Sequence, residues 1–317
     1  MVVVDYAALN VESIKVTLDE AVLIIVLDRA KQRNSYGGTL PTELIEMFTF
    51  ADRDDRVRVV VVTAEPDAPA YCSGADISSG WSQLFKPEDE AEGETGALPW
   101  THRINAIDVV VAHRDTGGKL SMAVYNCRKI TIAAVNGHAA GVGMTAMQLP
   151  FDLRFVWEGA KLVFPFVRRG INAEATSSYL LPRLLGHSRA NSLLLTGAVV
   201  SPTSPLISSL YHEIIPRRED VFPAALKLAK DLASNTSQIS IAYTKGLLQH
   251  PGDTIEDNHI LDSRAIRLTG SSADAAEGAV AFKEKRPPRF PDTLSKNSSP
   301  WYPWWKLVDV RHRKAKL

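Results

Sequence analysis

The chain has 317 residues and a mass of 34.7 kDa, more than a typical single domain and less than two. Its 36 Lys and Arg residues balance 36 Asp and Glu residues, which argues against binding of nucleic acid or an anionic membrane through overall charge. Apolar runs such as 21–27 are too short to span a bilayer, and residues 1–10 lack the pattern of a secretory signal. Two cysteines, Cys72 and Cys127, are too few for a disulfide framework or a zinc site. We expect a soluble intracellular protein with no metal, no membrane span and no nucleic-acid partner.

The beginning of the chain predicts a pair of strands followed by a helix. Residues 14–28 are rich in β-branched side chains, and Asp19-Glu20 marks a turn between two short strands. Residues 39–55 have helical periodicity, with Thr39 in the N-cap position and Pro41 in the first turn.

Buried strands and then helices are predicted for the remainder. Residues 56–63, RVRVVVVT, and 129–135, KITIAAV, form apolar runs typical of strands buried on both faces. Shorter strands are expected at 153–156 and 162–164, and beyond about residue 170 strands almost vanish. Helical periodicity covers residues 173–195, 220–249 and 253–285. The pattern indicates a mixed α/β core followed by a helical C-terminal portion.

Two stretches depart from this pattern. Residues 86–99, KPEDEAEGETGALP, are acidic and rich in Pro and Gly, which predicts a mobile loop. The tail 286–317 contains WYPWWKL, which we interpret as a docked aromatic cluster in preference to a ligand-binding element.

The sequence does not support several common types of catalytic or cofactor-binding site. The chain has no G-x-S-x-G elbow, and His212-Glu213 lacks the second histidine of a zincin helix. Its eight histidines are scattered. Residues 141–146 fit the dinucleotide pattern G-x-G-x-x-A, but NGHAA separates the preceding strand from the first glycine, so we do not expect NAD binding.

Two glycine-containing turns offer a better explanation. Residues 70–77, AYCSGADI, follow the VVVVT strand, and residues 136–143, NGHAAGVG, follow the KITIAAV strand. Either turn alone would be read as a tight turn with glycine at positive φ. If both turns direct backbone N–H groups to one point, they form an oxyanion hole.

Together, these turns resemble those of the crotonase family, also called the enoyl-CoA hydratase/isomerase superfamily. The resemblance covers about residues 14–290 and includes LDRAKQRNSYG, S-G-A-D-I, N-G-H-A-A-G-V-G and LPFDLRF, in which Asp152 takes the family's acidic position. The family's closing pattern is matched by Ser272, Asp274, Glu277, Gly278, Phe282, Lys285 and Arg286.

The resemblance implies an α/β crotonase-like spiral of ββα units with a helical C-terminal trimerisation region. We expect a spiral core with the acyl-CoA site at 1–220, an oligomerisation region at 221–290 and a tail at 291–317. The implied substrate is an acyl-CoA thioester. No separate cofactor is expected, because coenzyme A is part of the substrate.

The family's motifs also imply site residues. The two oxyanion-hole donors should be the backbone N–H groups of Ala75 and Val142. Lys31 and Arg33 lie where the family binds the adenosine and phosphates of CoA, although a solvated loop explains them equally well. The full set of expected substrate or CoA contacts is Lys31, Arg33, Ser73, Gly74, Asp76, Ile77 and Gly141. Cys72 has no evident histidine partner and is interpreted as a packing residue.

The carboxylates favour one reaction of the family over another. Hydratases place two glutamates where this chain has Thr145 and Phe166. Glu174 instead matches the segment that carries the base of peroxisomal Δ3,Δ2-enoyl-CoA isomerases, where one carboxylate can move a proton from C2 to C4. A glutamate that stabilises a helix N-terminus is the other interpretation of Glu174. Another crotonase-fold acyl-CoA enzyme (a hydratase, a dienoyl-CoA isomerase or a thioesterase) or a non-catalytic acyl-CoA binder remains an alternative function.

The last two expectations concern the oligomeric state and the location of the protein in the cell. Apolar helical periodicity in residues 220–285, with the resemblance, predicts a homotrimer or a dimer of trimers. The chain ends in Ala315, Lys316 and Leu317, a variant of the Ser-Lys-Leu signal read by the peroxisomal import receptor. This ending predicts the peroxisome matrix.

Overall fold

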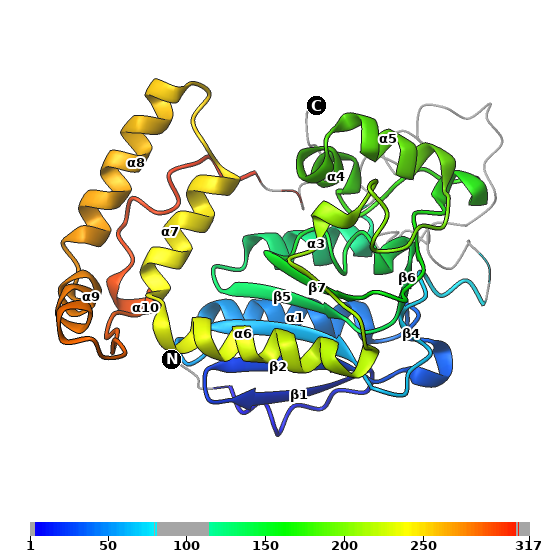
Figure 1. Ribbon diagram of the computed structural model, residues 1–317, viewed down its shortest axis with the longest axis horizontal. Coiled ribbons are helices and arrows are strands. Elements are labelled where there is room, and N and C mark those ends of the chain that lie inside the picture. Colours follow the sequence, from blue (N-terminus) through cyan, green and yellow to red (C-terminus); the bar gives the residue numbers. More distant parts are fainter. Residues whose placement is uncertain (1–3, 79, 81–113, 309, 311–317) are drawn as a thin grey trace, which may run out of the picture.

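A six-stranded sheet forms the centre of the molecule in the computed structural model, which describes residues 4–78, 80, 114–308 and 310 (Figure 1). Its strand order is β1-β2-β3-β5-β7-β9, with β1 antiparallel to β2 and every other neighbouring pair parallel. The bounds are β1 (Ile14–Asp19), β2 (Val22–Leu27), β3 (Val59–Ala64), β5 (Ile130–Val135), β7 (Leu153–Trp157) and β9 (Glu213–Ile215).

A second, three-stranded sheet is built from the segments that follow the strands of the first. It consists of β4 (Ala70–Cys72), β6 (His138–Ala140) and β8 (Leu162–Val163), in the order β4-β6-β8 and all parallel. The chain therefore passes from the large sheet to the small one three times, as β3 to β4, β5 to β6 and β7 to β8. This repetition confirms the expected spiral.

Helices cover both faces of the large sheet, and others extend beyond it. They are α1 (Leu40–Arg53), α3 (Thr116–Asn126), α4 (Ser177–Leu185), α5 (His187–Thr196), α6 (Val221–Asn235), α7 (Gln238–Gln249), α8 (Ile255–Gly270), α9 (Ala273–Glu284) and α10 (Leu294–Asn297). On β3, Val60 and Val62 face the core shared with α1 and α3, whereas Val59 and Val61 face the core shared with α6. Burial of the VVVVT strand on both faces is thus confirmed.

Several boundaries differ from the sequence expectations. Residues 173–176 lie before α4, and Gly186 separates α4 from α5, so residues 173–195 do not form one helix. The longer predicted helical stretches are likewise divided, at 236–237 and 271–272. The sequence reading missed α3, which begins with Thr-Gly-Gly, and the strands β4, β6 and β9, which are only three residues long. Three residues are too few to show a periodic pattern.

The C-terminal helices form an arm beside the sheet (Figure 1). The expected boundary between residues 220 and 221 falls before α6, but α6 packs on the sheet, and α7 is the helix that leads into the arm. The tryptophan-rich segment packs on α7: Trp301 and Trp304 stack at 4.6 Å between ring centroids, and Trp305 stacks on His250 at 3.9 Å. The interpretation of this segment as a docked aromatic cluster is confirmed. The acidic stretch 86–99 lies outside the described residues.

Candidate active site

The small sheet brings three segments of the chain to one edge. Because β4, β6 and β8 are parallel neighbours, the segments that follow them leave from the same side of the sheet. These segments are the 73–77 turn after β4, the short 3₁₀ turn Gly141–Gly143 after β6, and the loop 164–174 after β8. Each contains residues that the sequence singled out.

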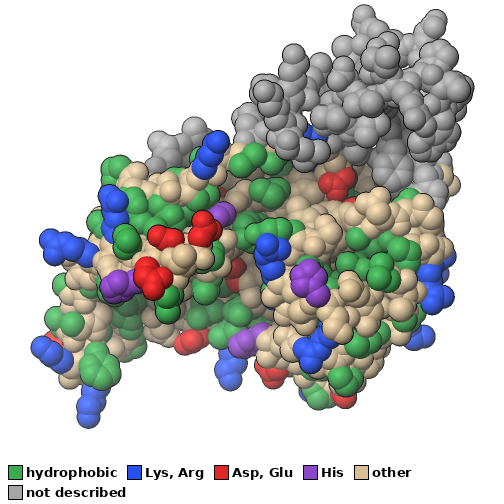
Figure 2. All heavy atoms as spheres, turned by 90° about the horizontal axis from the view of Figure 1, so that it is seen from above, with side chains coloured by type: hydrophobic (Ala, Val, Ile, Leu, Met, Phe, Trp, Pro, Cys, Tyr) green, Lys and Arg blue, Asp and Glu red, His purple; other side chains and the backbone are tan. Residues whose placement is uncertain are grey.

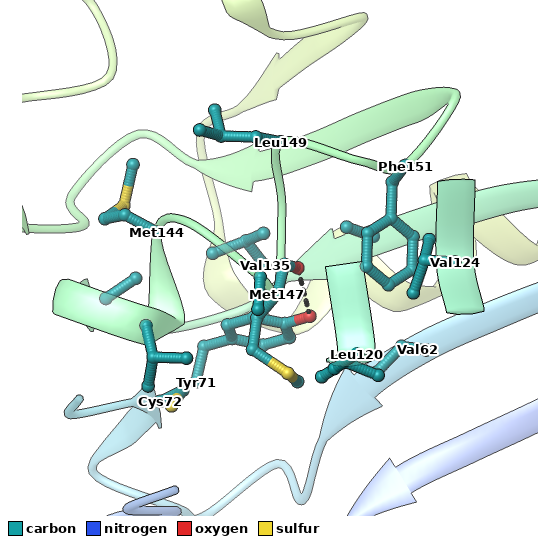
Figure 3. Close-up of a cluster of buried hydrophobic side chains, with 14 of the residues drawn as sticks. Val62, Tyr71, Cys72, Leu120, Val124, Val135, Met144, Met147, Leu149 and Phe151 are labelled. Carbon is teal, nitrogen blue, oxygen red and sulfur yellow. Dashed lines mark hydrogen bonds between the residues drawn. The ribbon is translucent and has the colours of Figure 1, made fainter. Parts of the chain in front are cut away.

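The first two turns are in direct contact. Gly74 has φ of +102°, and a Cβ added there would lie 3.1 Å from the carbonyl oxygen of Ala140. Only glycine suits this combination of left-handed backbone and close approach. Nearby, the buried Tyr71 of β4 donates its hydroxyl to the carbonyl of Met147 at 3.2 Å (Figure 3). The two turns are therefore packed directly against each other.

The backbone N–H groups of Ala75 and Val142 belong to these turns. Within the described part of the chain, neither N–H donates to a protein acceptor. Amides without protein partners on two adjoining turns have what an oxyanion hole needs. The assignment of Ala75 and Val142 as its donors stays a prediction.

The leading motif runs beside the first turn. Tyr36 N–H donates to Gly74 at 2.8 Å, Asp76 N–H donates to Tyr36 at 3.0 Å, and Ser73 N–H donates to Arg33 at 3.1 Å. LDRAKQRNSYG and S-G-A-D-I are therefore parts of one structure, although they are far apart in the sequence.

The side chain of Asp76 links the S-G-A-D-I turn to the LDRAKQRNSYG segment. Its carboxylate lies 3.6 Å from Arg29 Nη2 and accepts hydrogen bonds from the hydroxyls of Ser35 at 3.2 Å and Ser78 at 2.7 Å. The hydrogen bonds from Ser78 are the largest influence that lowers the pKa of Asp76. These contacts give Asp76 a structural role, and its expected contact with substrate stays a prediction.

The expected CoA-binding cations lie at the surface. Lys31 and Arg33 are exposed, and in the described part of the chain their side chains make no hydrogen bond or ion pair. Ser73 and Ile77 are also exposed, whereas Gly141 is buried in the second turn. These positions leave the first four residues accessible to a ligand, and their roles stay predictions.

Glu174 comes from the third segment and meets the second turn. Its Oε1 accepts a hydrogen bond of 2.5 Å from the hydroxyl of Thr145, a buried residue whose N–H donates to Gly141 at 3.0 Å. A Cβ added to Gly117 of α3 would overlap Oε2 of Glu174. One carboxylate oxygen therefore faces the second turn, and the other lies against the glycine at the start of α3.

The environment of Glu174 changes its acidity. Burial is the largest effect, followed by the Thr145 hydrogen bond, which lowers the pKa, and the charge of Asp115, which raises it. The net result raises the pKa of Glu174 to about 7. A carboxyl group with a pKa near neutrality can both accept and return a proton under physiological conditions.

The backbone after Glu174 is strained and anchored. Ala175 and Thr176 have φ of +54° and +58°, conformations that non-glycine residues rarely adopt. Asp115 accepts the N–H of Ala175 at 3.0 Å, and the hydroxyl of Ser121 donates to the carbonyl of Ala175 at 2.9 Å. Such strain often occurs at functional sites. Glu174 therefore stands outside α4, and the interpretation of it as a helix N-terminal residue is wrong.

Asp115 and Gly117 are site residues that sequence reasoning missed. Asp115 is the N-cap of α3 and accepts the N–H of Gly118 at 3.0 Å. An Asp before a helical run is a recognisable N-cap signal. Asp115 is 59 residues before Glu174, so the sequence alone did not indicate that it contacts the Glu174 segment.

Apolar residues border the site. Phe166 and Phe164 are buried, and a Cβ added to Gly141 would lie 4.0 Å from Phe166 Cε1. Cys72 is fully buried as well, and this burial raises the pKa of its thiol to about 12. A neutral thiol of this kind is a packing residue, which confirms the interpretation of Cys72.

The remaining family motifs make structural contacts. Asp152 accepts hydrogen bonds from Thr131 N–H at 2.8 Å and from Lys245 at 2.8 Å, which joins β5 to α7. In the closing pattern, Glu277 pairs with Arg286 at 2.6 Å. These residues connect the arm to the core and to its own tail.

Two further properties concern only the residues that the structure describes. None of their helices is long and apolar enough to cross a membrane. No group of three or more His, Cys, Asp or Glu side chains among them is arranged to hold a metal ion.

Comparison with known proteins agrees with the fold and the motifs. The enoyl-CoA hydratase/isomerase family model matches residues 17–117 and 112–293. The enoyl-CoA hydratase AFT3-1 of Alternaria alternata is 39% identical over 279 residues, which cover 88% of this chain and 86% of that protein. The 1,2-epoxyphenylacetyl-CoA isomerase of Escherichia coli is 27% identical over 86% of this chain and 96% of its own length.

A solved structure extends the likeness to three dimensions. The enoyl-CoA hydratase from Bacillus anthracis superposes with a TM-score of 0.71 at 26% identity, covering 88% of this chain and 99% of that one. The chain belongs to the enoyl-CoA hydratase/isomerase family.

Proposed function

We propose that the protein is a Δ3,Δ2-enoyl-CoA isomerase that acts in fatty-acid β-oxidation. The observation that carries the proposal is Glu174, a carboxyl group with a pKa of about 7, set beside two turns that offer backbone N–H groups. Hydratases have a glutamate at each of two positions, and this chain has Thr145 and Phe166 there instead.

The arrangement supports a one-base proton transfer. The Glu174 carboxylate removes a proton from C2 of a 3-enoyl thioester, and the electrons of that C–H bond form a dienolate. The negative charge develops on the thioester oxygen, where the N–H groups of Ala75 and Val142 would stabilise it. Protonated Glu174 then delivers the proton to C4, which leaves the double bond between C2 and C3. The atoms balance without water or a cofactor.

Hydration of a 2-enoyl thioester is the second candidate. The observation in its favour is Asp115, a second carboxylate whose charge reaches Glu174. The Alternaria relative is also named a hydratase. However, both Asp115 oxygens accept backbone N–H groups, from Gly118 and Ala175. This engagement favours an anchoring role over activation of water.

Two substrates separate the candidates. An isomerase converts 3-enoyl-CoA to the conjugated 2-enoyl-CoA, with a rise in absorbance, whereas a hydratase consumes 2-enoyl-CoA and forms a 3-hydroxyacyl-CoA. General-base catalysis contributes ~10²–10⁴-fold, so Glu174→Gln should lower isomerase kcat by about that factor while CoA-ester binding is retained. Hydration faster than isomerisation would replace the proposal with the second candidate. Binding without either reaction would indicate a non-catalytic acyl-CoA binder.

A further inference from the structure

Thr145 stands where the hydratase pattern places an acid, and its hydroxyl contacts the Glu174 carboxylate. The Thr145 hydroxyl lies 2.5 Å from Glu174 Oε1 and 3.4 Å from the Gly141 carbonyl. A hydroxyl has one hydrogen to donate. The shorter contact is to the charged acceptor, so the hydrogen goes to Glu174.

The other carboxylate oxygen has a different environment. Glu174 Oε2 lies where a Cβ of residue 117 would be, so the absence of a side chain at Gly117 makes room for it. Within the described residues, Glu174 accepts hydrogen bonds at Oε1 and at its backbone carbonyl, and none at Oε2. The two oxygens of this carboxylate are therefore not equivalent.

We propose that Thr145 is a positioning residue for the base: its hydroxyl holds Oε1 of Glu174 against the second glycine turn and leaves Oε2 to exchange protons with the substrate. The inference rests on the proposed function, because it assigns a task to one oxygen of the proposed base. It also joins the base to the turn that carries Val142, since Thr145 N–H donates to Gly141 at 3.0 Å. The proton acceptor and the proposed oxyanion donor thus keep a fixed separation.

The hydrogen bond has a measurable consequence for acidity. Among the residues that the structure describes, the charge of Asp115 before α3 acts on Glu174, and Glu174 acts on Tyr36 in the leading motif and on Cys72 at the end of β4. Tyr36 and Cys72 have raised pKa values and are neutral at pH 7. Asp115 raises the pKa of Glu174, and Thr145 lowers it. Loss of the Thr145 hydroxyl should therefore raise the pH at which the base becomes active.

Proton exchange at C2 of a saturated acyl-CoA tests the inference. Hexanoyl-CoA has no double bond to isomerise or hydrate, so its exchange in D₂O reports only the base and the oxyanion hole. We expect the acidic limb of the exchange rate to move up by about one pH unit in Thr145→Val, which preserves the shape and removes the donor. Thr145→Ser should restore the wild-type profile. A limb that does not move in Thr145→Val would overturn the inference.

Controls distinguish positioning from structural damage. Thr63→Val removes another buried hydroxyl, which donates to Ala134 at 3.1 Å in β3, and should leave the limb unchanged. If Thr145→Val does not fold, Thr145→Ala provides a second variant without the donor and should show the same shift. If the wild-type protein exchanges the C2 proton but does not isomerise 3-enoyl-CoA, the proposed function is wrong. The role of Thr145 is then still decided by whether the acidic limb of the exchange rate moves in Thr145→Val.

Discussion

The Asp115 carboxylate accepts the backbone N–H of Ala175 at 3.0 Å while it caps the first turn of α3. One side chain thus fastens the residue after Glu174 to the helix that carries Gly117. Because both φ values after Glu174 are left-handed, this segment needs such an anchor to hold its conformation. The charge of Asp115 also acts on the neighbouring acid.

Asp115→Asn should shift the pH profile in the direction opposite to the loss of Thr145. The variant keeps one oxygen acceptor but loses the negative charge that raises the pKa of Glu174. The acidic limb of kcat/KM should move down by roughly half a unit. Asp257→Asn, which changes an exposed acid of α8, should leave the limb in place. An upward shift in Asp115→Asn would contradict the assigned electrostatics.

Stability should depend on Glu174 between about pH 4.5 and 7. Its ordinary pKa is 4.5, and folding raises it to about 7. The folded state therefore binds more protons in this window, so this group's contribution to the free energy of unfolding decreases as the pH rises. The shift corresponds to at most about 3 kcal/mol, reached above pH 7.

Glu174→Gln should therefore be more stable than the wild type at pH 8, with little difference at pH 4. Gln retains the size of the side chain and an oxygen that can accept from Thr145. Urea unfolding of both proteins at the two pH values measures the difference. A difference that is the same at both pH values would mean that Glu174 does not have a raised pKa in the folded protein.

Gly117→Ala should impair catalysis through the carboxylate of Glu174. The new Cβ would overlap Glu174 Oε2 and force the carboxylate to move. A displacement of about 1 Å can cost about 10²-fold in rate. Alanine is a better helix former than glycine, which offsets part of the crowding of the new Cβ against Ala175 Cβ at 3.1 Å.

Gly270→Ala provides the matched control for Gly117→Ala. Gly270 ends α8, and no heavy atom lies within 4 Å of its added Cβ. Its kcat should equal that of the wild type. If Gly117→Ala also retained full kcat, the position of Oε2 would not matter for the reaction.

The sequence predicted the parts of the fold that local patterns specify. The apolar runs of β3 and β5 are long enough to indicate burial on both faces, and the two glycine turns follow them directly. Glu174 was found because its segment matched a motif, although its left-handed surroundings were mistaken for a helix.

The sequence could not show which distant residues meet. Asp115 and Gly117 contact the Glu174 segment only because β4, β6 and β8 bring their following loops together against α3. Those strands have two or three residues each, and their pairing depends on tertiary structure. The Thr145 hydrogen bond is of the same kind: the sequence indicated a missing acid there, and the structure shows a donor in its place.

We propose that the C-terminal tripeptide directs the protein to the peroxisome matrix. Ala315, Lys316 and Leu317 lie outside the described residues, and their small, basic and large apolar side chains match the chemistry of the Ser-Lys-Leu type of signal. A fluorescent reporter that carries the last residues should enter peroxisomes. Deletion of Leu317 should leave the full protein in the cytosol, and continued import would place the signal elsewhere.

The arm exposes apolar side chains that we propose are covered by other copies of the chain. Ile255, Ile260 and Phe282 are 82%, 66% and 86% exposed, and a groove of about 540 Å³ along α8 is lined by Ile260, Arg264 and Leu268 among others. Figure 2 shows hydrophobic side chains among charged ones on the side where these helices lie. Large apolar side chains gathered on neighbouring helices and left this exposed are candidates for an interface between copies of the chain.

Light scattering should give a mass of about 104 kDa, three chains of 34.7 kDa, or twice that value for a dimer of trimers. Ile260→Glu should shift the population toward the monomer, because a charge buried in an apolar interface costs several kcal/mol. Leu195→Glu, at a 68% exposed position on α5, should leave the assembly intact. A wild-type mass of 34.7 kDa at micromolar concentration would contradict the trimer. If only Leu195→Glu dissociated the protein, the interface would lie on α5 instead of the arm.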